Sequence, residues 1–415
     1  MAAILFISID LIAQKPIQEE LFSDNVETVQ IYPLGEQLGD PFLVLGDRSS
    51  KLVLSFDLFG QEYENLEYTL IHCSADWIPT DLLPNEYIEG YTEAYIRDYD
   101  YSINTKQPYI HYRLLFPEEN MTLTKSGNYI LKVYPEDQED QALFVKRVMV
   151  LDPKTNIAGK VNRSSDPSIR KTHQEVDFSV NISSLGSQFP SKEIRVFIRQ
   201  NGRWDNMKKD LQPLSISGGV MDFDLNEENV FKGLNTFRYF DFSSQRYNSE
   251  YLDRIDVSGE IDKVYLLADN IRRYQEYIAD PDFHGAYFIE TKDWTNSRIE
   301  AEYSDVNFTL NYDVPLLDGN VYILGELTNW RITPYNKMTY NYDKKAYETT
   351  LFLKQGYYSY VYAFLPTGAK EGDVSFFEAS HYETQNQYYI FVYYRAPGTI
   401  YDQLVGINVF KDYSF

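Results

Sequence analysis

Short runs in which apolar and polar residues alternate recur along most of the chain. Successive side chains on a strand point to opposite faces, so this period of two is typical of strands that bury one face. Gly, Pro, Asn and Asp separate the runs, and Asn201-Gly202 between two of them is a typical hairpin turn. The pattern therefore predicts an all-β protein. The clearest strands are expected at 51–58, 109–116, 176–182, 194–199, 306–312, 320–324 and 388–394.

A lysine, a nearby glycine and an aromatic-rich strand occur together three times. The glycines are Gly127, Gly233 and Gly356, which lie 106 and 123 residues apart. One immunoglobulin-like sandwich has about 100 residues, and such sandwiches place a packing tyrosine near the start of a late strand. We therefore expect tandem immunoglobulin-like or early-set β-sandwiches. The alternative is that Gly-x-Tyr recurs by chance in a tyrosine-rich chain.

Unit boundaries are expected where the alternation stops. Leu151-Asp-Pro153-Lys-Thr-Asn156 ends a first unit, and a polar stretch over 291–301 ends a second. The expected units are therefore 24–153, 157–298 and 299–415.

The segment 263–278 is ambiguous, because its apolar residues lie at helical spacing. A strand at 264–268 with a return at 286–290 fits the turn Asp280-Pro281-Asp282 better than a helix does. We therefore expect strands here and keep the helix as the alternative.

The amino terminus has the order of parts of an export signal. An apolar run over 2–9 is followed by the small residue Ala13 and then by a polar segment with Pro16. This order predicts a signal peptide over 1–13 and a protein outside the cytoplasm. Asp10 interrupts the run and no basic residue precedes it, so a buried first strand is the alternative. The run is too short to span a bilayer, and we expect no membrane insertion.

The composition narrows the classes of partner. With 38 Lys and Arg against 62 Asp and Glu, the net charge is −24 at pH 7, which disfavours nucleic acid as a partner. The same acidic excess favours solubility, and we expect a monomer apart from any complex. Cys73 is the only cysteine, so an intramolecular disulfide and a CxxC site are both excluded.

The sequence contains no motif that indicates catalysis. Adjacent residues on a strand point to opposite faces, so His72 and Cys73 cannot form a catalytic dyad on one strand. A GxSxG motif and a glycine-rich phosphate loop are both missing. We therefore expect no enzyme, catalytic residue, cofactor or metal. The histidines also lack metal-ligand spacing: His72, His111, His173, His284 and His381.

The last quarter of the chain contains a set of informative segments, at residues 319–330, 336–338, 347–351 and 355–360. Through these segments it resembles the early-set sandwiches of starch- and glycogen-binding modules. The resemblance implies that Trp330 stacks on a sugar ring, although the motif also accommodates a structural tryptophan. It gives an alternative function, that of a periplasmic glycan-binding protein.

A second resemblance covers nearly the whole mature chain. It rests on residues 66–77, 82, 86–90, 96–105, 109–117, 125–129, 201–206 and 355–358. Through these segments the chain resembles the plug protein family of the type IX secretion system of Bacteroidetes. This resemblance implies a non-enzymatic periplasmic protein associated with the outer membrane. Its partner would be the giant outer-membrane β-barrel translocon, whose periplasmic opening it binds and plugs.

A plug needs a broad interface, and such interfaces are enriched in Tyr, Trp and Arg at their centres. The aromatic and acidic segment 87–101 of the first unit is too polar to be entirely core, so we expect the interface there. The alternative is an ordinary inter-strand loop whose tyrosines pack downward. The expected interface residues are Tyr87, Tyr91, Tyr95, Asp98, Tyr99 and Tyr101.

Overall fold

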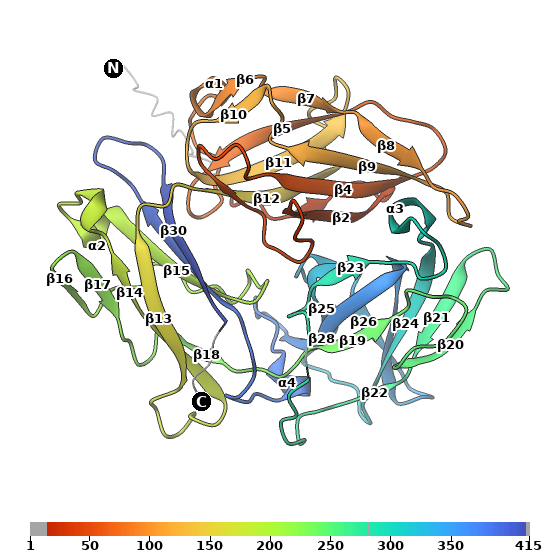
Figure 1. The fold of residues 1–415 in the computed structure, drawn as a ribbon. Coiled ribbons are helices and arrows are strands. Elements are labelled where there is room, and N and C mark those ends of the chain that lie inside the picture. The colour runs from red at the N-terminus through yellow and green to blue at the C-terminus, as the bar shows by residue number, and fades with distance from the viewer. Residues whose placement is uncertain (1–14, 281, 412–415) are drawn as a thin grey trace, which may run out of the picture.

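The computed structural model describes residues 15–280 and 282–411, so the signal peptide expected over 1–13 lies outside the described residues. Strands dominate, and the all-β expectation is confirmed. Three units with separate cores lie around a common centre (Figure 1). None of the helices in the described part of the chain has the length and apolar character needed to cross a membrane. The helices are α1 (Pro84–Tyr87), α2 (Pro190–Glu193), α3 (Ser297–Glu300) and α4 (Ser375–Glu378), with 3-10 turns at Ser183–Leu185 and Glu326–Thr328.

The first unit packs a six-stranded sheet against a four-stranded one. Phe56 and Tyr112 stack at 5.2 Å between ring centroids, and Phe144 of the opposite sheet meets Phe56 edge-on. Alternate residues of these strands therefore fill one core, as the period of two predicts. The strands are β1 (Glu20–Leu21), β2 (Val26–Pro33), β3 (Phe42–Val44), β4 (Leu52–Phe59), β5 (Leu66–Cys73), β6 (Ile88–Gly90), β7 (Glu93–Ile96), β8 (Asp98–Tyr101), β9 (Tyr109–Phe116), β10 (Met121–Leu123), β11 (Gly127–Pro135) and β12 (Phe144–Leu151).

The second unit is completed by the carboxy-terminal strands. β15 pairs with β29 along its whole length, from Ile194 opposite Tyr394 to Gln200 opposite Tyr388, and β30 follows β29. In Figure 1 these blue strands lie beside the yellow and green strands of the unit. The strands are β13 (Asn156–Arg163), β14 (His173–Asn181), β15 (Ile194–Gln200), β16 (Ser215–Ser217), β17 (Val220–Phe223), β18 (Val230–Lys232), β29 (Tyr388–Tyr394) and β30 (Gln403–Phe410).

This pairing corrects the linear division into 157–298 and 299–415. Val196 and Ile390 share the second core although they lie on opposite sides of the expected boundary. The chain leaves the second unit after β18, builds the third unit, and returns for the last two strands. Alternation within a strand identifies the strand but not its partner, so the sequence pattern could not reveal this return.

The third unit contains a ten-stranded sheet array around its own core. The segment at 263–278 contains no helix and forms strands only up to residue 270, but β21 pairs with β20 and β24, whereas β23 pairs with β28. The expected strands are therefore present without the expected pairing between them. The strands are β19 (Arg238–Asp241), β20 (Leu252–Asp256), β21 (Asp262–Leu266), β22 (Asp269–Asn270), β23 (Tyr287–Ile289), β24 (Tyr303–Asn311), β25 (Gly319–Leu324), β26 (Lys337–Asn341), β27 (Ala346–Lys354) and β28 (Gly356–Pro366).

Two of the three lysine–glycine motifs form the same corner. Gly127 opens β11 and Gly356 opens β28, and each is followed two residues later by a buried tyrosine. The Tyr129 hydroxyl donates to the carbonyl of Lys125 at 2.8 Å, and the Tyr358 hydroxyl donates to the carbonyl of Lys354 at 2.5 Å. This backward hydrogen bond is the packing role expected of a sandwich tyrosine. The third motif differs, because Gly233 lies in the crossing between the second and third units.

A buried ion pair joins the first unit to the third. Asp57 of β4 and Lys354 of β27 are both almost fully buried, and the ammonium lies 2.5 Å from the carboxylate. Tyr303 and His111 also hydrogen-bond to Asp57, at 2.7 Å each. Burial alone would raise the pKa of the Asp57 carboxyl, but Lys354 and His111 together lower it. The carboxylate is therefore ionised and fully partnered between the two units.

The other pairs of units are also held by direct contacts, most of which involve buried groups. One hydrophobic cluster contains Trp77 of the first unit and Phe391 of the second. Arg199 of β15 pairs with Asp40 of the first unit at 2.6 Å. Between the second and third units, the buried Arg203 donates to the carbonyl of Gly372, and Lys232 forms an exposed ion pair with Asp373 at 3.0 Å. Each unit is thus fixed to both of the others.

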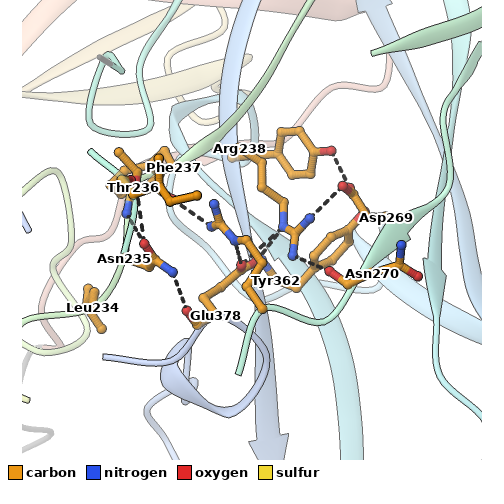
Figure 2. Close-up of polar contacts among 12 residues, drawn as sticks. Leu234, Asn235, Thr236, Phe237, Arg238, Asp269, Asn270, Tyr362 and Glu378 are labelled. Carbon is orange, nitrogen blue, oxygen red and sulfur yellow. Dashed lines mark hydrogen bonds and ion pairs between the residues drawn. The ribbon is translucent and has the colours of Figure 1, made fainter. Parts of the chain in front are cut away.

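Buried ion pairs also join separate segments of the third unit (Figure 2). Arg238 of β19 bridges Glu378 of α4, at 2.8 Å, and Asp269 of β22, at 2.5 Å. Arg272 approaches the same Glu378 carboxylate at 2.7 Å. Burial would raise the pKa of Glu378, but the two guanidinium groups lower it to about 2.

Removing one partner of the interunit ion pair should destabilise the protein strongly. In Lys354→Met, Asp57 loses its ammonium partner inside the interface, and we expect a loss of about 3–5 kcal/mol in the free energy of unfolding. The control is Lys344→Met, which breaks the exposed Lys344–Glu348 pair and should cost less than about 1 kcal/mol. Urea unfolding measures both variants, and equal losses would contradict a special role for the buried pair.

The Glu378 cluster predicts a defined pH dependence. The pKa of Glu378 in the folded protein, about 2, lies below its ordinary value of 4.5, so its ionisation stabilises the fold above pH 4.5. The contribution disappears as the pH falls from 4.5 toward 2. Glu378→Gln should therefore lower the free energy of unfolding at pH 7, with a smaller difference from wild type at pH 4 and smaller still at pH 3. Urea unfolding at the three pH values tests this, and a difference that does not change with pH would contradict it.

Candidate partner-binding surface

The expected interface segment contains one buried and several exposed tyrosines. Tyr87 is only 3% exposed, and its hydroxyl donates to the Leu70 carbonyl at 2.9 Å. Its ring meets Tyr129 edge-on in the core. The structure therefore removes Tyr87 from the expected surface, because it is the last residue of the short helix α1 and its side chain packs into the first core.

The other five expected residues lie on two edge strands and the turn before them. Tyr91 is 65% exposed, Tyr95 37% and Tyr101 49%, while Tyr99 is half-buried and Asp98 is exposed. β7 is the last strand of the six-stranded sheet and β8 is the last strand of the four-stranded sheet. We call this surface, made of Tyr63, Tyr91, Tyr95, Asp98, Tyr99, Asp100 and Tyr101, the tyrosine edge.

Contacts between the side chains hold part of the tyrosine edge in place. Tyr63 stacks on Tyr99 with 4.4 Å between ring centroids. The Tyr95 hydroxyl donates to Glu136 at 2.7 Å, and this hydrogen bond raises the pKa of Tyr95 to about 12. Asn65 links Tyr63 to Glu136, since its side chain accepts a hydrogen bond from the Tyr63 hydroxyl and donates one to the Glu136 carboxylate. The phenol ends of Tyr63 and Tyr95 are therefore held in place, so these two rings have little conformational freedom left to lose on binding.

The tyrosine edge is strongly acidic. Between residues 61 and 101 the chain carries ten Asp and Glu and a single basic residue, Arg97. Asp98 has a loose ion pair with Arg113 of β9 at 3.5 Å. Asp100 lies opposite His111 and is exposed. The surface therefore combines exposed aromatic rings with an excess of negative charge.

Tyr63 is a member that the sequence analysis missed. It lies 36 residues before Tyr99 in a polar segment, and nothing in the local pattern distinguishes it from other tyrosines. Its stacking partner is fixed by the sandwich itself, which brings the start of β5 close to β8. A signal for this contact would have required knowledge of the strand order.

Trp330 lies at the junction of the second and third units. The residue is half-buried, and the backbone of Gly202 is so close that an added Cβ would lie 2.2 Å from Nε1. Gly285 approaches the other end of the ring, and Phe237 meets it edge-on. These contacts give Trp330 a packing role, and its sugar-stacking role stays a prediction.

Trp330 also borders a cavity of about 360 Å³ where the three units meet. Its charged lining residues are largely paired: Lys146 with Glu19 at 2.9 Å and Arg199 with Asp40 at 2.6 Å. Burial raises the pKa of Glu326, also in the lining, to about 7. We interpret the cavity as a polar gap between units, because most of its charged lining residues are already paired with one another.

One group of acids in the described residues has a spacing that suits a cation. Glu175, Asp177 and Asp224 bring their carboxylates within 4.8 Å of one another. Protein donors already bind two of them: Ser165 donates to Glu175 at 2.8 Å and Asn162 to Asp177 at 2.6 Å. Asp224, the third member, is exposed, and such acidic groups are common without an ion, so we assign no metal site here.

The fold and these surfaces define a protein of three interlocked β-sandwiches with an exposed aromatic edge. The family model described as the type 9 secretion system plug protein 1st domain matches residues 26–152. A crystal structure of a hypothetical protein from Parabacteroides merdae ATCC 43184 is 36% identical. It covers 96% of this chain and 100% of its own, with a TM-score of 0.93. The chain belongs to the type IX secretion system plug family, and its role is related to type IX secretion.

Two further comparisons add nothing to this assignment. Dimeric latent PorU from Porphyromonas gingivalis is 12% identical over 92% of this chain and 34% of its own, and its TM-score of 0.14 carries no argument. No curated protein matches the chain. The Parabacteroides structure is more informative, because its high TM-score extends over all three units and so includes their mutual arrangement.

Buried and exposed tyrosines of the candidate segment should differ in their effect on stability. Tyr87→Phe removes the donor to the buried Leu70 carbonyl and should lower the free energy of unfolding by about 1 kcal/mol. Tyr91→Phe, at an exposed position, should leave it unchanged. Urea unfolding compares the two variants. A loss in Tyr91→Phe that equals the loss in Tyr87→Phe would contradict this division.

Proposed function

We propose that this protein is a non-enzymatic periplasmic subunit that binds and plugs the periplasmic opening of the giant outer-membrane β-barrel translocon of the type IX secretion system. The observation that carries the proposal is the match of the first unit, over residues 26–152, to the plug family. We expect it to be exported and to associate with the outer membrane through the barrel.

The physical demands on such a plug agree with the structure. A pore wide enough for folded proteins leaks small solutes when idle, so its stopper must be wide and must resist deformation. Here each unit contacts both others through buried groups, including Asp57–Lys354 and Arg199–Asp40. Bending at one boundary would therefore break contacts at another. This supports a role in which the three sandwiches move as one body.

We place the contact with the barrel on the tyrosine edge. Stable interfaces bury on the order of 1,200–2,000 Å² in total, with aromatic residues prominent at their energetic centres. Tyr91, Tyr95 and Tyr101 expose much of their rings, and their neighbours add negative charge that would favour a partner with a basic rim. Tyr87 is excluded from this proposal because it is buried.

Affinity purification from detergent-solubilised outer membranes tests the proposal. The wild-type chain should recover a very large outer-membrane barrel, and the triple variant Tyr91→Ala, Tyr95→Ala, Tyr101→Ala should recover at least about tenfold less, since three interface tyrosines are lost. The matched control replaces Tyr247, Tyr274 and Tyr342 of the third unit, which are 65%, 83% and 74% exposed, by alanine and should recover as much barrel as wild type.

The two possible failures have different meanings. Wild-type protein that recovers no barrel would contradict the plug function. Recovery that falls equally in both triple variants would contradict only the placement of the interface. Unfolding midpoints of the variants establish that each remains folded.

A further inference from the structure

The backbone of β8 leaves hydrogen-bonding groups open at the edge of its sheet. The sheet order is β2-β4-β9-β8, so β9 lies on one side of β8, and no strand among the described residues pairs with the other side. Asp98 lies opposite Arg113 and Asp100 opposite His111, and the ladder continues with the Ser102 N–H donating to the Tyr109 carbonyl at 2.9 Å.

The direction of each backbone group follows from this register. In an antiparallel pair, hydrogen-bonded and non-hydrogen-bonded positions alternate along the strand. Ser102 bonds to β9, so Asp98 and Asp100 also direct their N–H and C=O groups to β9. Tyr99 and Tyr101 then direct theirs outward. Two residues of β8 therefore present paired donors and acceptors at the spacing that an added strand requires.

The side chains leave this edge accessible. Asp98, Asp100 and Tyr101 are exposed, and Tyr99 is half-buried. Proteins usually protect an edge strand with lysine, proline, a bulge or a covering segment, because an open edge pairs readily with another chain. β8 has the sequence Asp-Tyr-Asp-Tyr, with neither lysine nor proline, and pairs with β9 without a register shift.

The charge of the edge selects among the strands that could pair with it. Ten acids and one basic residue lie between 61 and 101, and Asp98 and Asp100 share one face of β8. Like charges opposite each other on neighbouring strands are destabilising and opposite charges are stabilising. A second copy of the chain pairing through β8 would bring acids against acids. An extended segment rich in lysine or arginine would instead place positive charges opposite Asp98 and Asp100.

We propose that β8 binds an extended, basic segment of the partner protein by strand addition. The partner's backbone pairs with the outward N–H and C=O groups of Tyr99 and Tyr101. Its basic side chains lie opposite Asp98 and Asp100, and its other side chains pack beside Tyr101. The proposal rests on the proposed function in taking the barrel as the partner, and it specifies the chemistry of the contact.

Amide hydrogen exchange distinguishes strand addition from contact through side chains alone. In the free protein, the outward amides of Tyr99 and Tyr101 should exchange fast and the inward amides of Asp98 and Asp100 slowly. In the complex purified from outer membranes, the Tyr99 and Tyr101 amides should become at least tenfold slower. Fragmentation mass spectrometry resolves these positions. If the barrel is recovered and these two amides exchange as in the free protein, strand addition is wrong and the plug function stands.

Reversing the charge of β8 tests whether the partner segment is positively charged. Asp98→Lys with Asp100→Lys should reduce recovery of the barrel at least tenfold. The control Glu227→Lys with Glu228→Lys makes the same change in net charge at exposed positions of the second unit and should leave recovery unchanged. Equal recovery by both double variants would overturn the basic partner segment.

Failure to recover any barrel would contradict the proposed function. Even then, a peptide probe tests whether β8 binds an extended basic segment. A six-residue peptide that alternates arginine and valine should bind the full chain and slow exchange at Tyr99 and Tyr101. The matched peptide that alternates glutamate and valine should not bind. In that case, failure of the basic peptide to bind, or binding that the double variant of Asp98 and Asp100 does not weaken, would overturn the proposal for β8.

Discussion

The arrangement of the molecule depends above all on the pairing of Asp57 with Lys354 across the boundary between the first and third units. A charge buried without a partner is destabilising, so each group fixes the position of the other. Lys354 also connects this contact to the fold of its own unit, because its carbonyl accepts a hydrogen bond from the hydroxyl of the corner residue Tyr358. The lysine that precedes the glycine motif thus contributes both to the sandwich corner, through its backbone, and to the interunit contact, through its side chain.

The sequence predicts the strands well and their partners poorly. β9 and β29 begin and end where the alternation predicts, since burial of one face is a local signal. The return of β29 to pair with β15 has no local signal, because almost 200 residues separate the strands. The same limit applies to the surface. Clustering of tyrosines and acids predicts an interface at the segment 87–101, but the inward direction of Tyr87 and the stacking of Tyr63 on Tyr99 follow from packing alone.

Rigidity and an open edge are complementary properties in the proposed plug. Three units that contact one another through buried polar groups lose little conformational freedom when they bind, so more of the interaction energy remains as affinity. The tyrosine edge lies on the first unit, whose Asp57 contact connects it to the third. The family match covers this first unit, and the Parabacteroides structure shares the arrangement of all three.

The central claim is that this protein closes a wide pore as one rigid body and without covalent chemistry. The most direct test is the entry of a large antibiotic that porins exclude, measured in the native host with the chain deleted and with the chain and the barrel both deleted. The account predicts increased entry in the first strain and normal entry in the second. Normal entry in the strain that lacks only this chain, with the barrel present in its outer membrane, would contradict the account.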